Sequence, residues 1–313
     1  MVSRSERIQR RFRDEGDCII ELTRSFNKTI DWLFQNALLK RNTSCPKCLS
    51  EMSSKSDKSQ FDNFYFLCEN CFTKKSIRFR TIFEDSRLTL VESVRLIFHY
   101  FIEKKTLRET SAELGVCKST IIKINHQLQR TISDYVYGTY YCHQLGEVSL
   151  IIDEGRNENG VVEVDETLFC HIEGTQIWVF GILDRATREA RAFVVKDRSS
   201  ETLLTLIKEH VKPEVVVYSD GWQGYSRLEE LGFDHRKVNH SQTFGEGQDT
   251  TNNIENYWKH LKEITHQSSG VQPGKEDPWN RVQEIINEGI WRLRFHSEEL
   301  KDELVHIINC LYF

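Results

Sequence analysis

The chain has 313 residues, of which 39% are hydrophobic and 28% charged, and it contains only four prolines. This composition is typical of a folded protein with about two domains. No apolar run reaches the ~18 residues of a membrane-spanning helix, and the first residues lack the apolar core of a signal peptide. We therefore expect an intracellular protein with no membrane partner.

Charge is unevenly distributed along the chain. Residues 1–140 carry 24 Lys and Arg against 17 Asp and Glu, a net charge of +7, whereas residues 141–313 carry 18 against 30, a net charge of −12. A basic front half joined to an acidic back half fits DNA binding coupled to a metal-dependent centre. An ordinary acidic surface would also explain the net charge of −12 in residues 141–313.

The front of the chain divides into two predicted segments. Residues 1–40 carry apolar side chains at spacings of three and four, which predicts an N-terminal helical segment. Residues 41–84 contain two C-x2-C pairs separated by 19 residues, a spacing typical of a zinc ribbon with one structural Zn²⁺ ion. The four predicted zinc ligands are Cys45, Cys48, Cys68 and Cys71.

Two properties of this ribbon remain open at the level of sequence. Two unrelated thiol pairs would give the same four cysteines, although the chain's odd total of nine argues against a disulfide framework. We expect the aromatic residues between the pairs to pack a hairpin: Phe61, Phe64, Tyr65 and Phe66. The basic residues after it would either contact DNA or form a solvated face: Lys74, Lys75, Arg78 and Arg80.

Residues 85–142 are predicted to form a helix-turn-helix DNA-binding region. A helix is expected from Thr89 to Phe101, followed by two shorter helices. Ser111 permits close helix packing, and Gly115, four residues later, supplies the turn. Val116 and Ile121 would fill the interface, although a helical hairpin within a scaffold would look the same. The second helix would present four residues to DNA: Lys118, Ser119, Thr120 and Lys123.

A polar linker is predicted at residues 143–160, before a catalytic domain at 161–313 with C-terminal helices. Three consecutive strands followed by alternating helices and strands indicate an α/β fold, a mixed sheet flanked by helices. Strands are expected at 161–167, 175–184, 190–196, 214–220 and 235–240. Helices are expected at 200–211, 222–231, 251–266, 278–295 and 298–312.

Three acidic residues of this domain are candidate catalytic residues. Asp165 lies on an alternating strand, Asp220 ends a short β-rich run, and Glu255 opens a helix. Carboxylates gathered from distant positions suit hard cations such as Mg²⁺ or Mn²⁺. Two such ions ~3.5–4 Å apart can run in-line phosphoryl transfer.

The pattern leaves several assignments around these acids unresolved. Glu163 and Glu166 compete with Asp165 for the first position, and Glu163 points to the same strand face. Lys259 and Lys262 would hold a DNA phosphate, or Lys259 would simply pair with Glu255 on the helix surface. His240 could assist the site or be structural, whereas Trp258, on the same helix as Glu255, belongs with Ile254, Leu261 and Ile264 to a core-facing stripe.

With these residues assembled, the chain resembles Merlin-type cut-and-paste DNA transposases and their bacterial insertion-sequence relatives, which share an ISXO-like catalytic domain. The likeness spans about residues 40–266. Its motifs are Cys45-Pro46-Lys47-Cys48, Thr81-Ile82-Phe83-Glu84-Asp85-Ser86-Arg87-Leu88, Val162-Glu163-Val164-Asp165-Glu166, Trp178-Val179-Phe180-Gly181, Ser219-Asp220-Gly221-Trp222, Val238-Asn239-His240-Ser241 and Thr251-Asn252-Asn253-Ile254-Glu255.

The resemblance implies a ribonuclease-H-like core in which Asp165, Asp220 and Glu255 hold two Mg²⁺ ions, and it favours Asp165 over its neighbours. It also implies that the front half binds terminal inverted repeats, with a nuclear site of action in a eukaryote and a cytoplasmic one in a bacterium. This sequence departs from its relatives in two places. Residues 169–175 lack the usual Lys or Arg, and only 34 residues separate Asp220 from Glu255.

The sequence therefore predicts a transposase that cleaves and joins double-stranded DNA, both transposon ends and target. Pairing of two ends requires a homo-oligomer, at least a dimer. Two alternatives stay open: a host-retained DNA-binding regulator that no longer cuts, and a structure-specific nuclease that cuts without joining.

Overall fold

The computed structural model describes residues 21–101, 103–146, 160–238, 251–265, 277–295 and 299–312. The chain forms two compact units, one of Met1–Thr131 with Ser297–Phe313 and one of Ile132–His296. Most of the predicted linker, the first half of the predicted N-terminal segment and His240 lie outside the described residues. None of the helices in the described ranges is long and apolar enough to cross a membrane.

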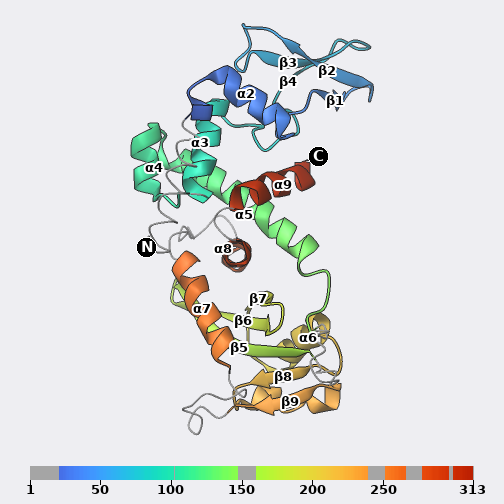
Figure 1. The fold of residues 1–313 in the computed structure, drawn as a ribbon, viewed down its shortest axis with the longest axis vertical. Coiled ribbons are helices and arrows are strands. Elements are labelled where there is room, and N and C mark those ends of the chain that lie inside the picture. Colours follow the sequence, from blue (N-terminus) through green and yellow to red (C-terminus); the bar gives the residue numbers. More distant parts are fainter. Residues whose placement is uncertain are drawn as a thin grey trace, which may run out of the picture. The chain divides into compact units, whose positions relative to one another are not determined.

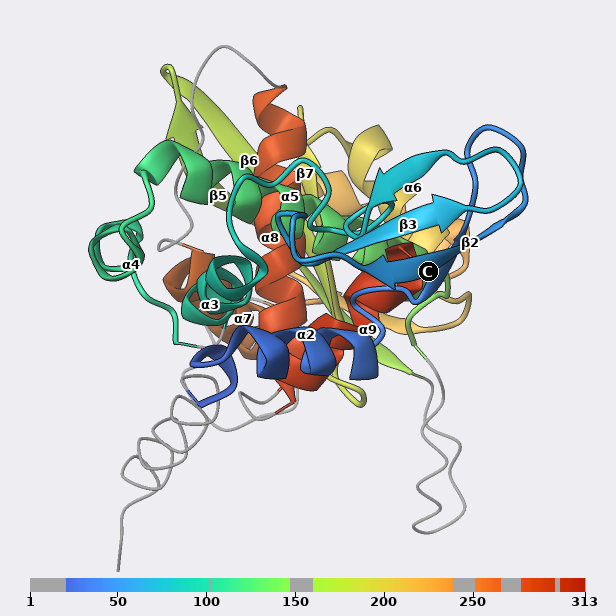
Figure 2. The ribbon, with the colours of Figure 1, turned by 90° about the horizontal axis from the view of Figure 1, so that it is seen from above.

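The first unit contains a four-stranded antiparallel sheet in the order β1-β2-β3-β4 (Figure 1). Its longest pairing joins β2 to β3, which are neighbouring arrows in Figure 2. The two C-x2-C pairs occupy the turns at either side of this pairing, one between β1 and β2 and one between β3 and β4. The strands are β1 (Asn42–Ser44), β2 (Glu51–Ser56), β3 (Phe64–Cys68) and β4 (Lys74–Ser76).

The same unit contains the helices that follow the sheet. Thr106 caps α4 by accepting from the Glu109 N–H, while the Glu109 carboxylate accepts from the Thr106 N–H, a reciprocal capping box. Gly115 ends α4 at φ 66°, a left-handed conformation that favours glycine. The described helices are α2 (Phe26–Gln35), α3 (Leu90–Phe101), α4 (Leu107–Leu114), α5 (Lys118–Thr139) and α9 (Leu300–Tyr312), and α5 continues into the second unit.

The second unit is built on a five-stranded mixed sheet in the order β7-β6-β5-β8-β9. β6 is antiparallel to β5 and β7, whereas β8 is parallel to β5 and β9 to β8. The predicted α/β class is therefore confirmed. The strands are β5 (Val161–Ile172), β6 (Thr175–Asp184), β7 (Ala190–Val195), β8 (Val216–Ser219) and β9 (Asp234–Lys237).

Helices cover both faces of this sheet. Phe193 of β7 stacks on His210 of α6, and α7 packs on the opposite face of β5 and β6. α8 packs against α7 and against the edge strand β7, where Gln283 bonds the backbone of Ala192 and Val194. Because α8 covers the edge strand β7, fewer of its backbone N–H and C=O groups are available to pair with another strand. The helices are α6 (Ser200–His210), α7 (Asn252–Thr265) and α8 (Pro278–Arg294).

One predicted helix is wrong. Residues 222–231 form two short 3-10 turns, η1 (Gln223–Tyr225) and η2 (Glu229–Leu231). Gly224 weakens helix formation, and the Trp222 ring packs so closely over it that a Cβ there would lie 2.2 Å from the ring. Gly232, at φ 88°, then ends the second turn.

The contact between α7 and β5 follows from matching repeats. Four residues of a helix and two residues of a strand each advance about 6 Å, so residues four apart on α7 stay opposite residues two apart on β5. Three strand residues of one face, Glu163, Asp165 and Thr167, bond successively to Ile254, Trp258 and Lys262 of α7. The first of these bonds joins the Glu163 carboxylate to the Ile254 N–H at 2.9 Å. α7 is thereby held along β5 in one register.

Gly181 provides the space for the middle bond. It lies opposite Asp165 on the neighbouring strand, and an added Cβ would meet the Trp258 ring at 2.3 Å. Because the position carries no side chain, the indole packs against the sheet and its Nε1–H reaches Asp165.

We expect Gly181→Ala to lower the free energy of unfolding by about 1–3 kcal/mol, because the added methyl group overpacks the Trp258 ring. Urea denaturation followed by circular dichroism measures the change. The control is Gly138→Ala in α5, where an added Cβ meets nothing within 4 Å and a gain of about 0.5–1 kcal/mol is expected. Equal stability of Gly181→Ala and the unsubstituted protein would contradict the close packing.

Candidate functional site

Asp165 lies on the central strand of the mixed sheet and faces α7. Its Oδ2 accepts a hydrogen bond of 3.0 Å from Trp258 Nε1. The pKa of Asp165 is raised to about 6, first by burial and then by the negative charges of Asp220 and Glu255, while the bond from Trp258 opposes the shift. The three acids are thus close enough to act on one another electrostatically.

Asp220 directly follows β8. β5 and β8 are parallel and Glu163 pairs with Tyr218, so the end of β8 lies beside the Asp165 region of β5. Asp220 Oδ1 accepts from the Trp222 N–H at 3.1 Å, which closes a tight turn over the acid. The Ser219 hydroxyl is 2.8 Å from both the Asp220 carbonyl and His235 Nε2, which further fixes this turn.

Glu255 lies in the first turn of α7 and is exposed. Its Oε1 accepts a hydrogen bond of 3.2 Å from the Thr251 hydroxyl. The neighbouring Ile254 N–H is one of the first four helix N–H groups, which have no partner within the helix. Because Glu163 accepts from that N–H, the turn that carries Glu255 is anchored to the sheet.

The three carboxylates do not form a closed cage. Among the described residues, the cysteine quartet is the only group of three or more possible metal-binding side chains whose ligand atoms all lie within 4.8 Å of one another. The acids lie in a looser arrangement. Their chemistry, three hard oxygen donors whose charges raise the Asp165 pKa, suits a divalent cation that would offset the repulsion.

The two competitors of Asp165 have different surroundings. Glu163 is fully buried. Its Oε1 accepts from Arg185 Nε and Asn253 Nδ2, both at 2.6 Å, in addition to the Ile254 bond. An acid at a helix N-terminus also interacts favourably with the helix dipole, so Glu163 serves as an anchor for α7.

Glu166 faces the opposite side of β5 from Asp165, because neighbouring strand residues alternate. Its pKa is raised to about 7, first by burial and then by the charges of Asp220 and Asp165. The Tyr225 hydroxyl interacts with the Glu166 carboxyl group and opposes part of this shift. Glu166 is therefore a further half-buried carboxyl group near Asp165 and Asp220.

The two lysines of α7 differ in exposure. Lys262 is half-buried and donates a bond of 2.6 Å to the Thr167 hydroxyl. Burial lowers its pKa, and the charge of Asp165 opposes this. Lys259 is exposed, one turn after Glu255. The structure thus places one cation beside Asp165 and a second on the outer face of the helix.

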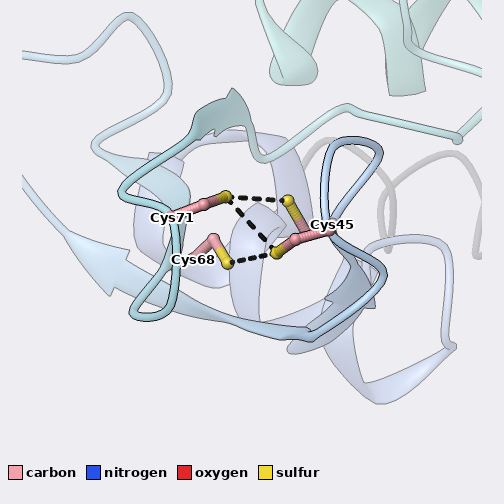
Figure 3. Close-up of side chains that lie close together, drawn as sticks. Cys45, Cys68 and Cys71 are labelled. Carbon is pink, nitrogen blue, oxygen red and sulfur yellow. Dashed lines mark hydrogen bonds between the residues drawn. The ribbon is translucent and has the colours of Figure 1, made fainter.

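The four cysteine sulfurs of the first unit converge, as the C-x2-C spacing predicts (Figure 3). Neighbouring sulfurs are 3.4–3.5 Å apart. The two turns are built alike: the Leu49 N–H donates to the Cys45 carbonyl, and the Phe72 N–H to the Cys68 carbonyl. Two unrelated thiol pairs would not converge in this way.

The quartet fits a tetrahedral metal ion. With Zn–S bonds of ~2.3 Å, ligand sulfurs are about 3.8 Å apart, close to the separations found here. Hydrogen bonds from the Ser50 side chain and N–H lower the pKa of Cys48 to about 6. A thiolate is the form that binds a metal.

Two details of the ribbon differ from the sequence prediction. Phe61 does not pack the hairpin but is 67% exposed. Arg78 is buried and bonds both Asp62 oxygens at 2.6 Å, as well as the Ser86 and Leu88 carbonyls. A paired and buried guanidinium is not available to DNA, so only the exposed Lys74 and Arg80 and the half-buried Lys75 remain as possible contacts.

The predicted DNA-contacting residues of α5 lie on its first two turns. Lys118, Ser119 and Lys123 are exposed and Thr120 is half-buried. Val116 and Ile121 are buried and pack with Leu96 of α3, as expected for interface residues. The Ser111 hydroxyl bonds the Val116 carbonyl at 2.8 Å, which ties α4 to the turn.

The sequence prediction missed the polar role of Trp258 and the packing role of Gly181. Ile254, Trp258 and Leu261 were assigned to a core-facing stripe, and all three are buried. The indole N–H, however, reaches a candidate catalytic acid. The available signal for this contact was a set of residues four apart on α7 and a matching set two apart on β5. Only the sheet order shows that the two segments meet.

Comparison with known proteins addresses this second unit. Residues 159–268 match the ISXO2-like transposase domain. A protein of Haemophilus influenzae described as an uncharacterized transposase-like protein is 33% identical over 111 residues, which are 36% of this chain and 84% of that protein. The chain belongs to this transposase family. The match contains Asp165, Asp220 and Glu255 but not the cysteine quartet.

Solved structures show more distant likeness. A retroviral (HTLV-2) integrase catalytic core in complex with magnesium is 12% identical with a TM-score of 0.32, over 42% of this chain and 83% of that one. A chain of the simian T-cell lymphotropic virus intasome in complex with PP2A regulatory subunit B56 gamma is 13% identical with a TM-score of 0.34, over 66% of this chain and 73% of that one. Likeness at this level is too low to assign the fold.

We expect Cys68→Ser to remove one bound zinc ion per chain, because three thiolates no longer close the tetrahedron. Elemental analysis of the purified protein measures the metal, and reaction with a thiol reagent reports newly accessible cysteines. The control is Cys142→Ser, an exposed cysteine outside the quartet, which should keep the metal. An unchanged zinc content in Cys68→Ser would refute the metal site.

We expect Asp165→Asn to stabilise the metal-free protein at pH 8, by up to about 3 kcal/mol. Between the ordinary value of 3.8 and the folded value of about 6, the folded protein holds a proton that the unfolded chain releases. Stability therefore falls as pH rises through this window and stays low above it. Urea denaturation in EDTA from pH 4 to 8 measures the difference.

The stabilising effect of Asp165→Asn should disappear near pH 4, where the native carboxyl group is also neutral. Glu230→Gln, an exposed acid of η2, serves as the control and should show little effect at any pH. A difference between Asp165→Asn and the unsubstituted protein that does not change with pH would contradict the assigned cause.

Proposed function

We propose that this transposase-family protein is a Merlin-type cut-and-paste DNA transposase. The observation that carries the proposal is that three separate elements within the family match bring acids together. The pairing of β5 with β8 places Asp220 beside Asp165, and the bond from the Ile254 N–H to Glu163 ties the turn that carries Glu255 to β5. The sheet order β7-β6-β5-β8-β9, with only β6 reversed, supports the ribonuclease-H-like description of the core. The three acids would hold two Mg²⁺ or Mn²⁺ ions.

Bound at these acids, the metal ions would supply Lewis-acid activation of a nucleophile and stabilise the leaving oxygen. The chain's own residues prepare the site. Trp258 fixes the Asp165 carboxylate by its 3.0 Å bond, and Glu163 anchors the helix turn that carries Glu255. Lys262, held beside Thr167, and the exposed Lys259 add positive charge for a DNA phosphate.

The reaction we propose has two transfers at one site. Water first hydrolyses the phosphodiester at the transposon end, and the freed 3′-hydroxyl then attacks a phosphodiester of the target DNA. Each step exchanges one P–O bond for another, so no oxidant, reductant or covalent protein intermediate is required. Joining two ends in this way calls for at least a dimer.

The first unit would bind the terminal inverted repeats. We propose a helix-turn-helix in which Lys118, Ser119, Thr120 and Lys123, at the start of α5, face the DNA. The exposure of Lys118, Ser119 and Lys123 and the packing of Val116 and Ile121 support this assignment. The cysteine quartet would hold one structural Zn²⁺ ion. The protein would act in the nucleus of a eukaryote or the cytoplasm of a bacterium.

We expect Asp165→Asn and Asp220→Asn each to reduce strand cleavage on the order of a thousandfold, because each removes a charge needed in the transition state. Gel electrophoresis of a labelled terminal-repeat duplex with Mg²⁺ measures cleavage, and an electrophoretic mobility assay measures binding. Binding should persist in both variants. Glu230→Gln, an exposed acid outside the site, should cut normally.

The same assay separates the alternatives. Cleavage retained in either Asp variant would refute the proposed site. Binding of the repeat by the unsubstituted protein without any cleavage would instead indicate a host-retained regulator. Cleavage without joining of a precleaved end to target DNA would indicate a nuclease.

A further inference from the structure

Arg198 lies at the same edge of the sheet as the candidate acids. β7 and β8 both run parallel to β5, so their carboxyl ends lie at one edge. Asp220 follows the end of β8, and Arg198 lies in the connection from β7 to α6. Leu168 of β5 pairs with Trp178 of β6, which pairs with Val195 of β7. The connection that follows β7 therefore lies level with the part of β5 just beyond Asp165.

The guanidinium of Arg198 is held in place by an aromatic ring. Its central carbon lies 3.7 Å from the centroid of the Trp178 ring. Trp178 Nε1 in turn donates a bond of 3.2 Å to Gln176 Oε1, which orients the indole. Stacking of this kind fixes the plane of an arginine while leaving its N–H groups free to bind an anion.

Arg198 is exposed. In the described part of the chain its charge acts on one half-buried carboxyl group, Glu166, without a direct ion pair. The adjacent Asp197 is engaged elsewhere, because its Oδ1 accepts from the Ser199 N–H and the Thr202 hydroxyl at the start of α6. By contrast, Arg185 is bound to Glu163 and Arg188 to Asn253.

The positive charge of Arg198 acts on Glu166, the half-buried carboxyl group on the other face of β5 from Asp165. It lowers the pKa of Glu166, against the larger effect of burial. Residues 169–175, which are the end of β5, the turn after it and the first residue of β6, contain no Lys or Arg. A DNA strand that approaches the acids along this edge therefore meets Arg198 instead of a cation from that segment.

We propose that Arg198, stacked on Trp178, binds a backbone phosphate of the DNA strand that is engaged at Asp165, Asp220 and Glu255. The inference rests on the proposed function and adds a substrate-binding residue to the same site. The phosphate is one next to the reacting position, since Arg198 stacks on Trp178, which pairs with Leu168, three residues beyond Asp165 on β5. An arginine fits this role because its planar fork matches phosphate oxygens.

The test compares full-length Arg198→Ala, Arg198→Lys and Trp178→Phe with a matched control, Arg227→Ala. Arg227 is also exposed and pairs with Glu230 in the turns after β8. The probe is a labelled terminal-repeat duplex with Ca²⁺ in place of Mg²⁺, and its affinity is measured over a range of salt concentrations. Circular dichroism melting confirms that each variant is folded.

We expect Arg198→Ala to weaken binding about tenfold, as for loss of a charged hydrogen bond. The slope of log affinity against log salt should become less negative by about 0.9, the value for one lost phosphate contact. Arg198→Lys should keep the slope and lose part of the affinity, Trp178→Phe should keep the slope, and Arg227→Ala should match the unsubstituted protein. A merely structural role would not change the salt slope.

An unchanged affinity and slope in Arg198→Ala would overturn the inference, as would equal changes in Arg227→Ala. The binding measurement does not depend on cleavage, so it stands apart from the test of the proposed function. If the unsubstituted protein cuts with Mg²⁺ while Arg198→Ala binds and cuts normally, only the inference about Arg198 fails. If the unsubstituted protein does not cut but Arg198→Ala still shows the less negative salt slope, the proposed function fails and the phosphate contact remains.

Discussion

The bond between the buried Glu163 carboxylate and the first turn of α7 holds the second unit's candidate site together. Glu163 accepts from the Ile254 N–H, from Asn253 and from Arg185. A buried carboxylate is costly unless it is fully bonded, so these partners and the acid depend on one another. Since Glu255 follows Ile254 directly, its place relative to Asp165 follows from this contact.

The rest of the contact between α7 and β5 repeats the same geometry. Equal advances of about 6 Å along helix and strand place Trp258 on Asp165 and Lys262 on Thr167. Gly181 allows the indole to approach, because the position has no side chain. Packing and polar contacts therefore determine the same register, and a substitution in either changes the surroundings of Asp165.

The acids are arranged at a cost to the stability of the metal-free protein. Burial and mutual repulsion raise the pKa of Asp165 to about 6 and that of Glu166 to about 7. Perturbed carboxyl groups of this kind gather at functional sites, where a ligand relieves the strain. Arg198, stacked on Trp178 at the same edge, adds an exposed positive charge, which is the charge that our proposal assigns to a backbone phosphate.

Sequence predicted the local parts of this arrangement well and the distant contacts poorly. The C-x2-C spacing states directly which sulfurs can share an ion, so the convergence of Cys45, Cys48, Cys68 and Cys71 followed from the chain itself. Alternation along β5 placed Glu163 and Asp165 on one face but could not separate their roles, because the partners of Glu163, which are Arg185, Asn253 and the Ile254 N–H, come from elsewhere in the fold.

The contacts that sequence could not predict join elements far apart in the chain. Trp258 meets Gly181 and Arg198 meets Trp178 only because of the order in which β7, β6 and β5 pair. The burial of Arg78 depends likewise on Asp62, a residue of the β2–β3 hairpin. The helix expected at 222–231 failed because Trp222 packs over Gly224, a contact that residue propensity does not describe.

Iron-mediated cleavage of the protein backbone tests most directly whether the three acids share one metal centre. Fe²⁺ bound at a Mg²⁺ site, with ascorbate, produces radicals that cut the nearest chain segments. Our account predicts cuts near Asp165, Asp220 and Glu255 together, all suppressed by excess Mg²⁺ and all absent from Asp165→Asn. Cuts at only one of these segments, or cuts that Mg²⁺ does not suppress, would contradict a common metal centre.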